Sequence, residues 1–429
     1  MTATPASVLA TPTPPTRVRY RVLALVLAAA VITYLDRVCI SVAAPQIQAD
    51  LGLSQEQMGY VFSIFATAYA IFEIPAAFLG DRWGQRRTMI RIVAWWSMFT
   101  MFTGLARGYG SLLATRFLFG AGEAGAFPTL SRALSRWFPF DARSRANGLM
   151  WMGARLGGAI SPVLAVLAIG AWGWRGTFGL FGVVGLAWVA IWSRWYRDDP
   201  ADQPSVNAAE LDLIRVGAAP APEKSQKLPW RTLLFQRDLL ILCATYFASG
   251  FGFQFFVTWL PTYLTREHGL TLQRSGFYAA LPLLAGAAGC ATGGLVADWI
   301  ARRFGSLKWG RRIVAVTGFF LGAAGFLFAI SARSPEMAVA CLVGASGLHD
   351  LTLPVAWATC TDLGGRFGGT AGGWMNLASS VSGMMAPVAA AYLAEAFGSF
   401  TALFWVAAGM YIIGGVLWFF IDPRRAAVN

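Results

Sequence analysis

The sequence predicts an all-α membrane protein with twelve transmembrane helices arranged as two six-helix halves. The first observation is composition: of 429 residues, 56% are apolar and 13% are charged, and the mean hydropathy is +0.55. Soluble proteins average roughly 45–50% apolar and about 25% charged residues. The second observation is the length of the apolar runs, because a spanning helix needs about 20 mostly apolar residues. Twelve such runs are centred near Ala28, Ala68, Met98, Gly120, Gly157, Val184, Phe251, Ala285, Phe320, Ala345, Val381 and Val406.

One long polar interruption divides the chain. Residues 197–237 contain DDPADQPSVNAAE and GAAPAPEKSQKLP and predict a linker with one amphipathic stretch. The linker separates a first bundle of six spans, 22–196, from a second bundle, 238–422. Residues 1–21 form a Pro- and Thr-rich tail without a short apolar core, so we expect no removable signal peptide. Residues 423–429 form a second tail.

The basic residues predict how the chain is oriented in the membrane. When the loops are counted alternately, 26 of the 34 Lys and Arg residues fall in one set and 5 in the other. Basic residues near helix ends stay in the cytoplasm, so both termini are expected to be cytoplasmic. The net charge of +13 then reflects topology and contact with anionic lipids of the bilayer, and does not indicate nucleic acid. The five cysteines lack metal-ligand spacing, so no disulfide, metal or cofactor is expected.

The two halves carry an internal repeat. An offset of 217 residues aligns Gly52 with Gly269 and Asp81 with Asp298. Two halves of the same orientation form a parallel repeat, which is the plan of transporters that rock two bundles around a site near the middle of the membrane.

The motif GDRWGQRR, residues 80–87, resembles the signature loop of the major facilitator superfamily. The stretches YLDRVCISVAAPQIQADLGLS (34–54), TRFLFGAGEAGAFP (115–128) and GGTAGGWMNLASSVSGMMAP (368–387) resemble its anion:cation symporter branch. This resemblance implies a carrier of an organic anion, such as a hexuronate, an aldonate or an aromatic acid. The excess of Arg over Lys, 31 against 3, indicates a GC-rich bacterial genome and therefore an inner membrane. The resemblance also implies that the acid of the loop pairs with basic residues and a neighbouring helix end, which latches the halves in one state. The loop residues are Gly80, Asp81, Arg82, Gly84, Arg86 and Arg87, with Asp298 at the repeated position.

Charges within the spans are candidate functional residues, because such a charge costs about 2.5–3.5 kcal/mol even on the gentlest insertion scale. By resemblance, Asp36 binds a proton and Arg37 binds the substrate carboxylate, to which a guanidinium donates two hydrogen bonds. The alternative is an Asp–Arg pair that only neutralises itself between helices. Glu123 is by resemblance the second proton carrier. Arg116, seven residues earlier on the same helix face, is its switching partner, or else the two form a static link.

Further polar residues are candidates for substrate contact. Tyr69 matches a substrate-contacting tyrosine of sugar-acid carriers. Glu73, on the same face of the helix, is either a cavity acid or a buried acceptor between helices. Gln254, Trp357 and Asn376 stand where the family offers groups that bind hydroxyls, although ordinary packing is the alternative for Trp357.

Two positions depart from the pattern of sugar-acid carriers. Arg155 places a third arginine in the fifth span, where an uncharged polar group is expected, and His349 and Asp350 add a titratable pair in the tenth. A second buried cation favours a substrate with two carboxylates or a second contact to an anion. The alternative is an ion pair between Arg155 and Glu73 or Asp350.

The function predicted is proton-coupled uptake of a small organic anion by alternating access, with the protein working as a monomer. Because Asp36 and Glu123 can each bind a proton, symport of two protons is favoured. Such transport is electrogenic unless the substrate is a dianion. Na⁺ is the alternative coupling ion, and export of a drug or metabolite is the alternative function, although Arg37 and Arg116 favour an anion. An enzyme is not expected, because the chain has two histidines, no HExxH motif, no nucleophile elbow and no sizeable soluble loop. A sensor with a transporter fold would lack the coupling acids.

Overall fold

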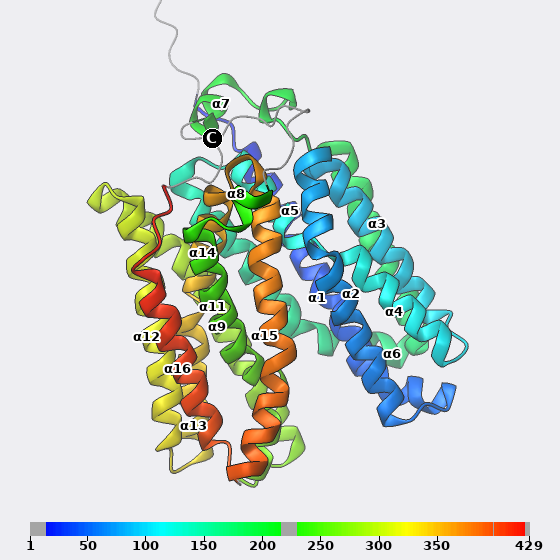
Figure 1. The fold of residues 1–429 in the computed structure, drawn as a ribbon. Helices are drawn as coiled ribbons and strands as arrows, with labels where there is room; N and C mark the ends of the chain where they lie inside the picture. Colours follow the sequence, from blue (N-terminus) through cyan, green and yellow to red (C-terminus); the bar gives the residue numbers. More distant parts are fainter. Residues whose placement is uncertain (1–13, 216–229, 398, 425–429) are drawn as a thin grey trace, which may run out of the picture.

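The computed structural model describes residues 14–215, 230–397 and 399–424. Within these ranges the chain forms helices and no strand. The helices form two bundles joined by the linker (Figure 1). Eight segments of the described chain are long and apolar enough to cross a membrane, and two of these, Phe140–Trp195 and Pro335–Ala386, contain more than one helix.

Glycines divide the helices of the first bundle. Gly173, with a φ of +66°, divides the longest helix in two. Gly125, with a φ of +81°, precedes the first residue of a shorter helix, and its missing side chain allows close approach to the backbone at Ala76 and Ala77. The elements are α1 (Val18–Leu51), α2 (Gln55–Trp83), α3 (Gln85–Gly104), α4 (Tyr109–Glu123), α5 (Ala126–Trp137), a 3-10 turn at Phe140–Ala142 and α6 (Arg143–Trp195).

The linker and the second bundle complete the chain. The linker contains a 3-10 turn (Pro200–Asp202), α7 (Ala208–Arg215) and α8 (Trp230–Leu234). The second bundle contains α9 (Arg237–Thr258), α10 (Leu260–Arg266), α11 (Leu272–Phe304), α12 (Leu307–Ile330), α13 (Pro335–His349), α14 (Thr352–Gly364), a 3-10 turn (Gly365–Phe367), α15 (Gly368–Phe397) and α16 (Thr401–Trp418).

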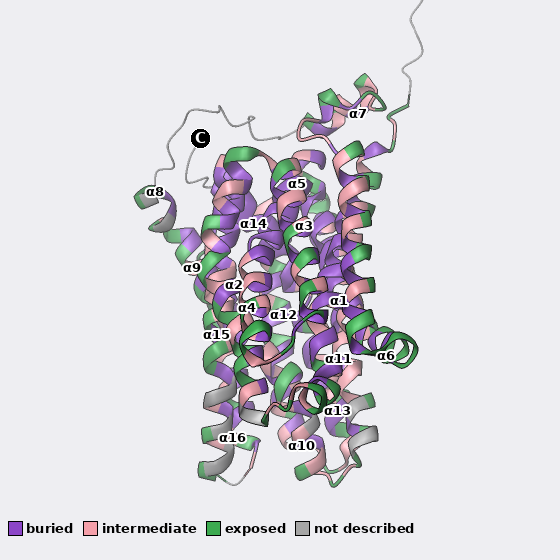
Figure 2. Ribbon diagram, turned by 90° about the vertical axis from the view of Figure 1, so that its right-hand side faces the viewer, coloured by how far each residue is buried: buried purple, intermediate pink, exposed green. Residues whose placement is uncertain are grey.

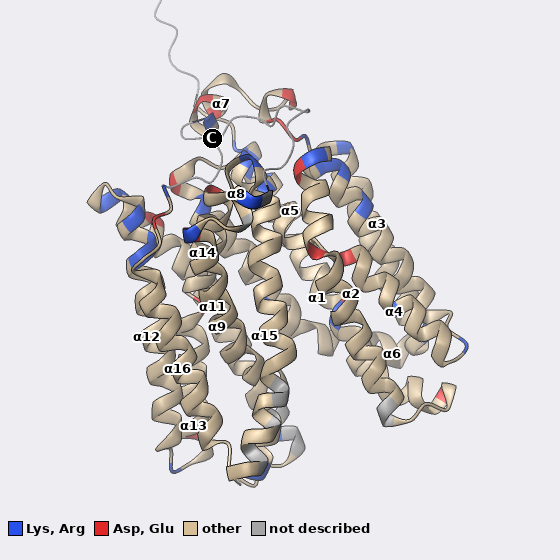
Figure 3. Cartoon of the chain, in the orientation of Figure 1, with Lys and Arg blue, Asp and Glu red and all other residues tan. Residues whose placement is uncertain are grey.

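The two bundles meet at one end of the molecule and diverge toward the other (Figure 1). We call the end that carries α7 the linker face and the opposite end the open face. Across the boundary, α6 contacts α11 and α14, and α2 and α5 contact α15. Lys and Arg residues gather at the linker face (Figure 3). The flanks of the helices are largely apolar and carry many exposed side chains (Figure 2), among them Leu105, Leu167, Trp172, Trp299 and Trp405, as expected of a surface that faces lipid.

Helix α1 begins at Val18, inside the stretch 1–21 that was expected to be a tail. The Glu210 carboxylate of α7 accepts hydrogen bonds from the backbone N–H groups of Val18 (3.0 Å) and Arg19 (3.1 Å). A carboxylate at this position satisfies otherwise unpaired N–H groups and interacts favourably with the helix dipole. The linker therefore extends α1 and fixes its first turn. Residues 1–13 and 425–429 of the expected tails, and 216–229 of the expected linker, lie outside the described residues.

The repeat seen in the sequence is also present in the backbone. Gly52 and Gly269 both have a positive φ, +64° and +63°. Two residues after each glycine, the side chain of Ser54 or Thr271 accepts a backbone N–H bond at the start of α2 or α11. The segments between these glycines and the two aspartates at the ends of α2 and α11 are therefore built alike in the two bundles.

Candidate functional site

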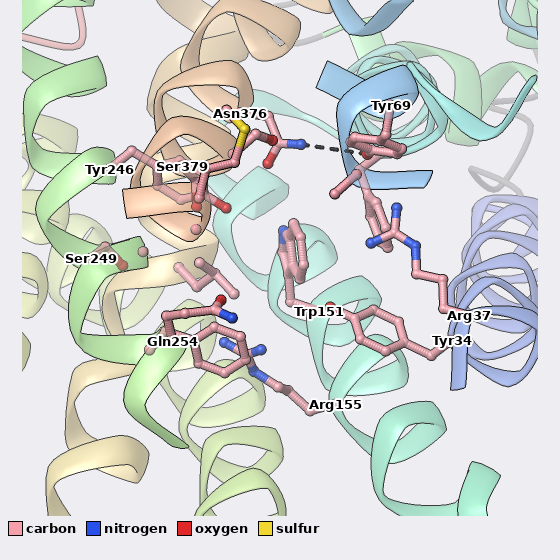
Figure 4. A pocket seen from close by; sticks show the side chains of 18 of the residues that line it. Tyr34, Arg37, Tyr69, Trp151, Arg155, Tyr246, Ser249, Gln254, Asn376 and Ser379 are labelled. Carbon is pink, nitrogen blue, oxygen red and sulfur yellow. Dashed lines mark hydrogen bonds between the residues drawn. The ribbon is translucent and has the colours of Figure 1, made fainter. Parts of the chain in front are cut away.

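A cavity of about 310 Å³ lies between the two bundles. Helices α1, α2, α5 and α6 of the first bundle and α9, α14 and α15 of the second form its wall. Five of the residues expected to contact substrate line it (Figure 4): Arg37, Tyr69, Arg155, Gln254 and Asn376. Ligand sites are commonly about 300–1,000 Å³ in volume, so this cavity suits a small molecule.

Arg37 lies in a cluster of aromatic rings at the cavity wall. Its Cζ is 4.6 Å from the ring centre of Tyr69 and between 5.4 and 5.9 Å from those of Phe65, Tyr34 and Phe127. Aromatic faces attract a guanidinium and hold it in place. The Nε atom donates a hydrogen bond to Glu123 Oε1 at 2.6 Å, and 22% of the side chain is exposed. Arg37 therefore has one carboxylate partner and part of its surface open to the cavity.

The structure pairs Glu123 with Arg37 instead of Arg116. Arg116 and Glu123 are seven residues apart on α4, which is a rise of about 10.5 Å along the helix axis. Helix α1, in contrast, brings Arg37 directly against Glu123 at the end of α4. The Arg116 side chain is buried, with its Cζ 4.2 Å from the Phe119 ring centre, and its Nε and Nη1 have no hydrogen-bond partner among the described residues. The Arg116–Glu123 bridge that the sequence led us to expect is therefore absent from this conformation.

Asp36 is buried away from the cavity, although it follows directly before Arg37 in the chain. Its carboxylate has Glu123 and Arg116 as charged neighbours and lies beside the polar groups of Trp96 and Thr100. Adjacent residues of a helix point about 100° apart, so the two charges face different surroundings. A self-neutralising pair between Asp36 and Arg37 is therefore not formed.

Glu73 is a buried acceptor between the bundles and does not line the cavity. Asn376 of α15 donates its amide hydrogens to Glu73 and, at 3.5 Å, to the Tyr69 hydroxyl. Ser380, one helical turn further along α15, donates to Glu73 Oε2 at 3.4 Å. In this conformation Glu73 and its partners link α2 to α15 through polar side chains.

Arg155 forms the ion pair with Asp350 that was the alternative to a substrate contact, yet it also lines the cavity. Its Nε and Nη2 donate to the two oxygens of Asp350 at 2.7 and 3.1 Å. His349 Nδ1 lies 3.5 Å from Asp350 Oδ1, and the His349 ring stacks on Tyr411 at 4.0 Å. The titratable pair expected in the tenth span is therefore part of a cluster that joins the two bundles.

Trp357, a candidate for substrate contact with ordinary packing as the alternative, does not line the cavity in this structure. Trp357 is fully buried, and its indole N–H donates to the Tyr246 hydroxyl at 2.8 Å. Tyr246 itself lines the cavity. Trp357 stands one layer back because its ring packs against Trp151 and Tyr246.

Other lining residues were not identified from the sequence. On α9, Tyr246, Ser249 and Phe253 follow the helical spacing that leads to Gln254, and on α15 Ser379 and Ser380 lie one turn after Asn376. Residues three or four apart share a helix face. This spacing around Gln254 and Asn376 was the signal that could have found them.

Asp81 joins the bundles at the linker face. Its carboxylate accepts hydrogen bonds from the backbone N–H groups of Gly369 (3.1 Å) and Thr370 (2.6 Å) and from the Thr370 hydroxyl (2.7 Å), all at the start of α15. Arg132 of α5 lies 3.8 Å away. The acid thus meets a basic residue and a helix N-terminus, which is the arrangement expected of a latch.

Asp298, the repeat equivalent of Asp81, makes the reciprocal contact. It extends from α11 of the second bundle and accepts the backbone N–H of Arg145, in the first turn of α6, at 3.0 Å. Each bundle therefore contributes one carboxylate that caps a helix of the other.

The remaining loop residues have different roles around Asp81. Gly80 packs against Thr129, and Gly84, with a φ of +86°, leaves room for Asp198. The backbone N–H of Arg86 donates to Asp198 at 2.9 Å, and its guanidinium donates to the Ser193 carbonyl. Arg82 and Arg87 are exposed. Gly84 and Arg86 thus hold the start of α3 against the start of the linker, and Gly80 packs α2 against α5.

A second ion-pair cluster at the linker face was missed. Asp362 of α14 pairs with Arg143 of the first bundle and, at 2.7 Å, with Arg311 of α12. All three side chains are buried. An acid after the apolar run VAWATC was the available signal, and its arginine partners come from distant parts of the chain.

Comparison with known proteins identifies the family. A profile of the Major Facilitator Superfamily matches residues 26–308 and 304–429. A probable sulfoacetate transporter from Cupriavidus necator is 36% identical over 95% of this chain and 94% of its own. A D-galactonate transporter from Escherichia coli is 32% identical over 96% and 97%, and a hexuronate transporter from Bacillus subtilis is 31% identical over 90% and 91%.

Solved structures share the fold at low sequence identity. A crystal structure of the fucose:proton symporter of E. coli has a TM-score of 0.73 with 14% identity and covers 94% of this chain and 99% of its own. A proton:xylose symporter has a TM-score of 0.74 with 13% identity over 94% and 96%. The relatives and fold neighbours are membrane transporters and not enzymes. The chain therefore belongs to the Major Facilitator Superfamily, in its branch of anion:cation symporters.

Proposed function

We propose that this protein is a secondary active transporter that takes up an organic anion together with protons, by alternating access to the central cavity. The named cargo of its relatives supports the choice of an anion: sulfoacetate, D-galactonate and hexuronate. The cavity wall supports it independently, because Arg37 and Arg155 face the space together with hydroxyl and amide groups. Guanidinium groups bind carboxylates with two parallel hydrogen bonds.

The observation that carries the proposal is the 2.6 Å ion pair between Arg37 Nε and Glu123 Oε1 at the cavity wall. A substrate carboxylate that approaches Arg37 competes with Glu123 for the guanidinium. Protonation of Glu123 removes the competing charge and leaves Arg37 to the substrate. Substrate binding and proton binding then favour each other by the same factor, which is the thermodynamic requirement for coupling.

Asp36 is the second proton site in this scheme. It forms no ion pair within the described residues, so it can gain or lose a proton without breaking a salt bridge. Arg116 lies close to both acids, and two of its nitrogen atoms have no hydrogen-bond partner in the described part of the chain. It can therefore compensate whichever carboxylate is charged when Arg37 turns to the substrate.

The orientation in the membrane follows from the distribution of charge. The basic linker face is assigned to the cytoplasm, so both termini are cytoplasmic and the open face is external. The bacterial relatives favour the inner membrane of a bacterium. Twelve spans result when α6 is divided at Gly173 and when the pairs α4–α5, α9–α10 and α13–α14 each count as one. The protein acts as a monomer and without a cofactor.

Proton entry into liposomes tests the function. Purified protein is reconstituted with an internal pH dye and challenged with hexuronates, aldonates, dicarboxylates and aromatic acids. We expect acidification with at least one anion, lost in Asp36→Asn and Glu123→Gln and retained in Glu336→Gln, a control that removes a carboxylate in the first turn of α13, far from the cavity wall. Entry of labelled anion without acidification would refute proton coupling, and a requirement for external Na⁺ would then identify the ion. If no anion enters, export of a drug or metabolite replaces uptake.

A further inference from the structure

A second guanidinium faces the cavity, apart from the one assigned to the substrate carboxylate. Arg155 projects from α6 toward Gln254 of α9 (Figure 4), and its Cζ lies 3.8 Å from the Phe253 ring centre. The proposed coupling step uses Arg37, Glu123, Asp36 and Arg116 and leaves Arg155 without a role. A buried charge in a membrane-spanning helix is costly, and such residues usually mark a substrate or ion pathway.

Asp350 occupies only one edge of the Arg155 guanidinium. The bonds from Nε and Nη2 run to the two Asp350 oxygens, and the buried Cys290 thiol is a further neighbour of the guanidinium. No hydrogen bond from Nη1 to a carboxylate is formed among the described residues. A guanidinium carries five N–H groups in a planar fork, so a second edge remains for another anion. Asp350 is in turn contacted by His349 from its own chain segment. Asp350 therefore orients Arg155 while leaving part of it free to bind.

The backbone of α11 is shaped to admit this pair. A Cβ atom at Gly286 would contact Asp350 Oδ2 and lie 3.5 Å from Arg155 Nε, and one at Gly289 would lie 3.3 Å from Asp350 Cβ. Two glycines one turn apart thus provide the space in which side chains from opposite bundles meet. The position of Arg155 is set by the fold and does not depend on a flexible surface contact.

The two cations share one cavity. Both line the same cavity of about 310 Å³. The Tyr34 side chain is an electrostatic neighbour of Arg37 and of Arg155. In Figure 4, Trp151 lies between the two guanidinium groups, and the hydroxyl and amide groups of α9 and α15 lie across the cavity.

We propose that the substrate is a small dianion, with one anionic group bound by Arg37 and the other by the free edge of Arg155. The inference rests on the proposed anion transport and names the class of anion. A monoanion at Arg37 leaves the open edge of Arg155 without a partner, and a site built to bind a group discriminates against ligands that lack it. With two protons per cycle, transport of a dianion is electrically neutral.

Binding to matched pairs of anions tests the proposal. The pairs have equal carbon number and differ in one carboxylate: butyrate with succinate, hexanoate with adipate, and galactonate with galactarate. Calorimetry at pH 7.5 on the purified full chain is expected to show roughly 10- to 100-fold tighter binding of the dianion in at least one pair, the range for one added charge-assisted contact. This measurement on the unaltered protein does not depend on whether any variant folds.

Two variants locate the second anion site. Asp350→Asn keeps Arg155 and is expected to keep the preference for the dianion. The double variant Arg155→Gln with Asp350→Asn removes both charges, so no buried carboxylate is left unpaired. It is expected to lose the preference for the dianion. The affinity for the monoanion should stay within about threefold of that of the unaltered protein, because a monoanion bound at Arg37 makes no contact with Arg155.

Each outcome bears on one of the two proposals. Equal affinity for both members of every pair, or a preference that survives in the double variant, would overturn the dianion proposal and leave anion transport standing. An equal loss of affinity for both members in the double variant would also overturn it, because that result assigns Arg155 to the structure of the cavity. If none of the anions binds or enters liposomes, the transport function itself fails.

Discussion

Replacing Asp81 with Asn is expected to shift the protein away from the conformation with a closed linker face. The Asp81 carboxylate bonds to Gly369 through Oδ1 and to the backbone and side chain of Thr370 through Oδ2. An amide keeps one accepting oxygen and turns an NH₂ group toward N–H donors on the other side. The change therefore removes at least one bond and the negative charge at the start of α15.

The size of the effect follows from these contacts. A hydrogen bond to a charged acceptor contributes about 1.5–3 kcal/mol. A negative charge at a helix N-terminus contributes about 0.3–1 kcal/mol when exposed and up to about 2 when partly buried. Because part of this interaction is retained by Asn, we expect a loss of about 2–3 kcal/mol. The contacts join α2 of one bundle to α15 of the other, so the loss falls on the closed state alone. The ratio of closed to open linker faces should fall about 30- to 150-fold.

Distances between spin labels on the two bundles measure this ratio. Cysteines at the exposed linker-face positions Arg87 and Arg303, one on each bundle, carry the labels in lipid nanodiscs. Asp198→Asn is the matched control, because Asp198 also accepts a backbone N–H bond, from Arg86 at 2.9 Å, but within one side of the molecule. The longer distance should gain population in Asp81→Asn only. Identical distributions in the unaltered protein and Asp81→Asn, or an equal shift in the control, would refute the latch.

Three further predictions concern single side chains. Glu123→Gln releases Arg37 from its ion pair. Anion affinity measured at pH 8 should then rise at least about tenfold, because a hydrogen bond to a charged group contributes about 1.5–3 kcal/mol. Unchanged affinity would contradict competition between Glu123 and the substrate for Arg37. Trp357→Phe removes the N–H group that fixes the Tyr246 hydroxyl. Anion binding should weaken about fivefold, which corresponds to one hydrogen bond of about 1 kcal/mol. A fall in Tm with unchanged affinity would show that Trp357 acts in packing alone. Hydrogen bonds from Arg424 and Lys308 hold the pKa of Asp422 below its usual range, so its ionised form stabilises the fold, and that contribution is lost only as pH falls through the lowered pKa. Asp422→Asn should therefore lower the Tm equally at pH 8 and pH 5. If the difference in Tm between the variant and the unaltered protein is smaller at pH 5 than at pH 8, the pairing of Asp422 with Arg424 and Lys308 is excluded.

Much of the fold could be predicted because apolar length and local turn chemistry carry most of the information. The membrane spans followed from hydrophobicity, and the repeat from matched residues such as Gly52 and Gly269, which share a positive φ. The start of α1 could not be predicted. It depends on Glu210, a residue about 190 positions away that caps the helix, and no local pattern indicates such a contact.

The residue types of the site could be predicted better than their pairings. Charges in apolar spans pointed to Arg37, Glu123 and Arg155, and all three lie at or beside the cavity. Helical spacing suggested that Glu123 would meet Arg116, but spacing on one helix says nothing about a closer cation on the neighbouring helix. The partner of Trp357 could not be predicted either, because its buried indole N–H donates to Tyr246 of another helix.

The charged contacts fall into two groups according to whether they cross between the bundles. The pair of Arg37 and Glu123 lies within the first bundle, whereas the contacts of Asp81 and Asp350 cross between the bundles. In the proposed alternating-access cycle the first pair can persist, while the crossing contacts must break or rearrange. Coupling requires a connection between the two groups. Tyr69 provides one, because its ring lies 4.6 Å from the Arg37 guanidinium and its hydroxyl accepts a hydrogen bond from Asn376 of the opposite bundle. A substrate that displaces Arg37 from Glu123 therefore acts on a residue that touches α15, the helix whose first turn Asp81 holds.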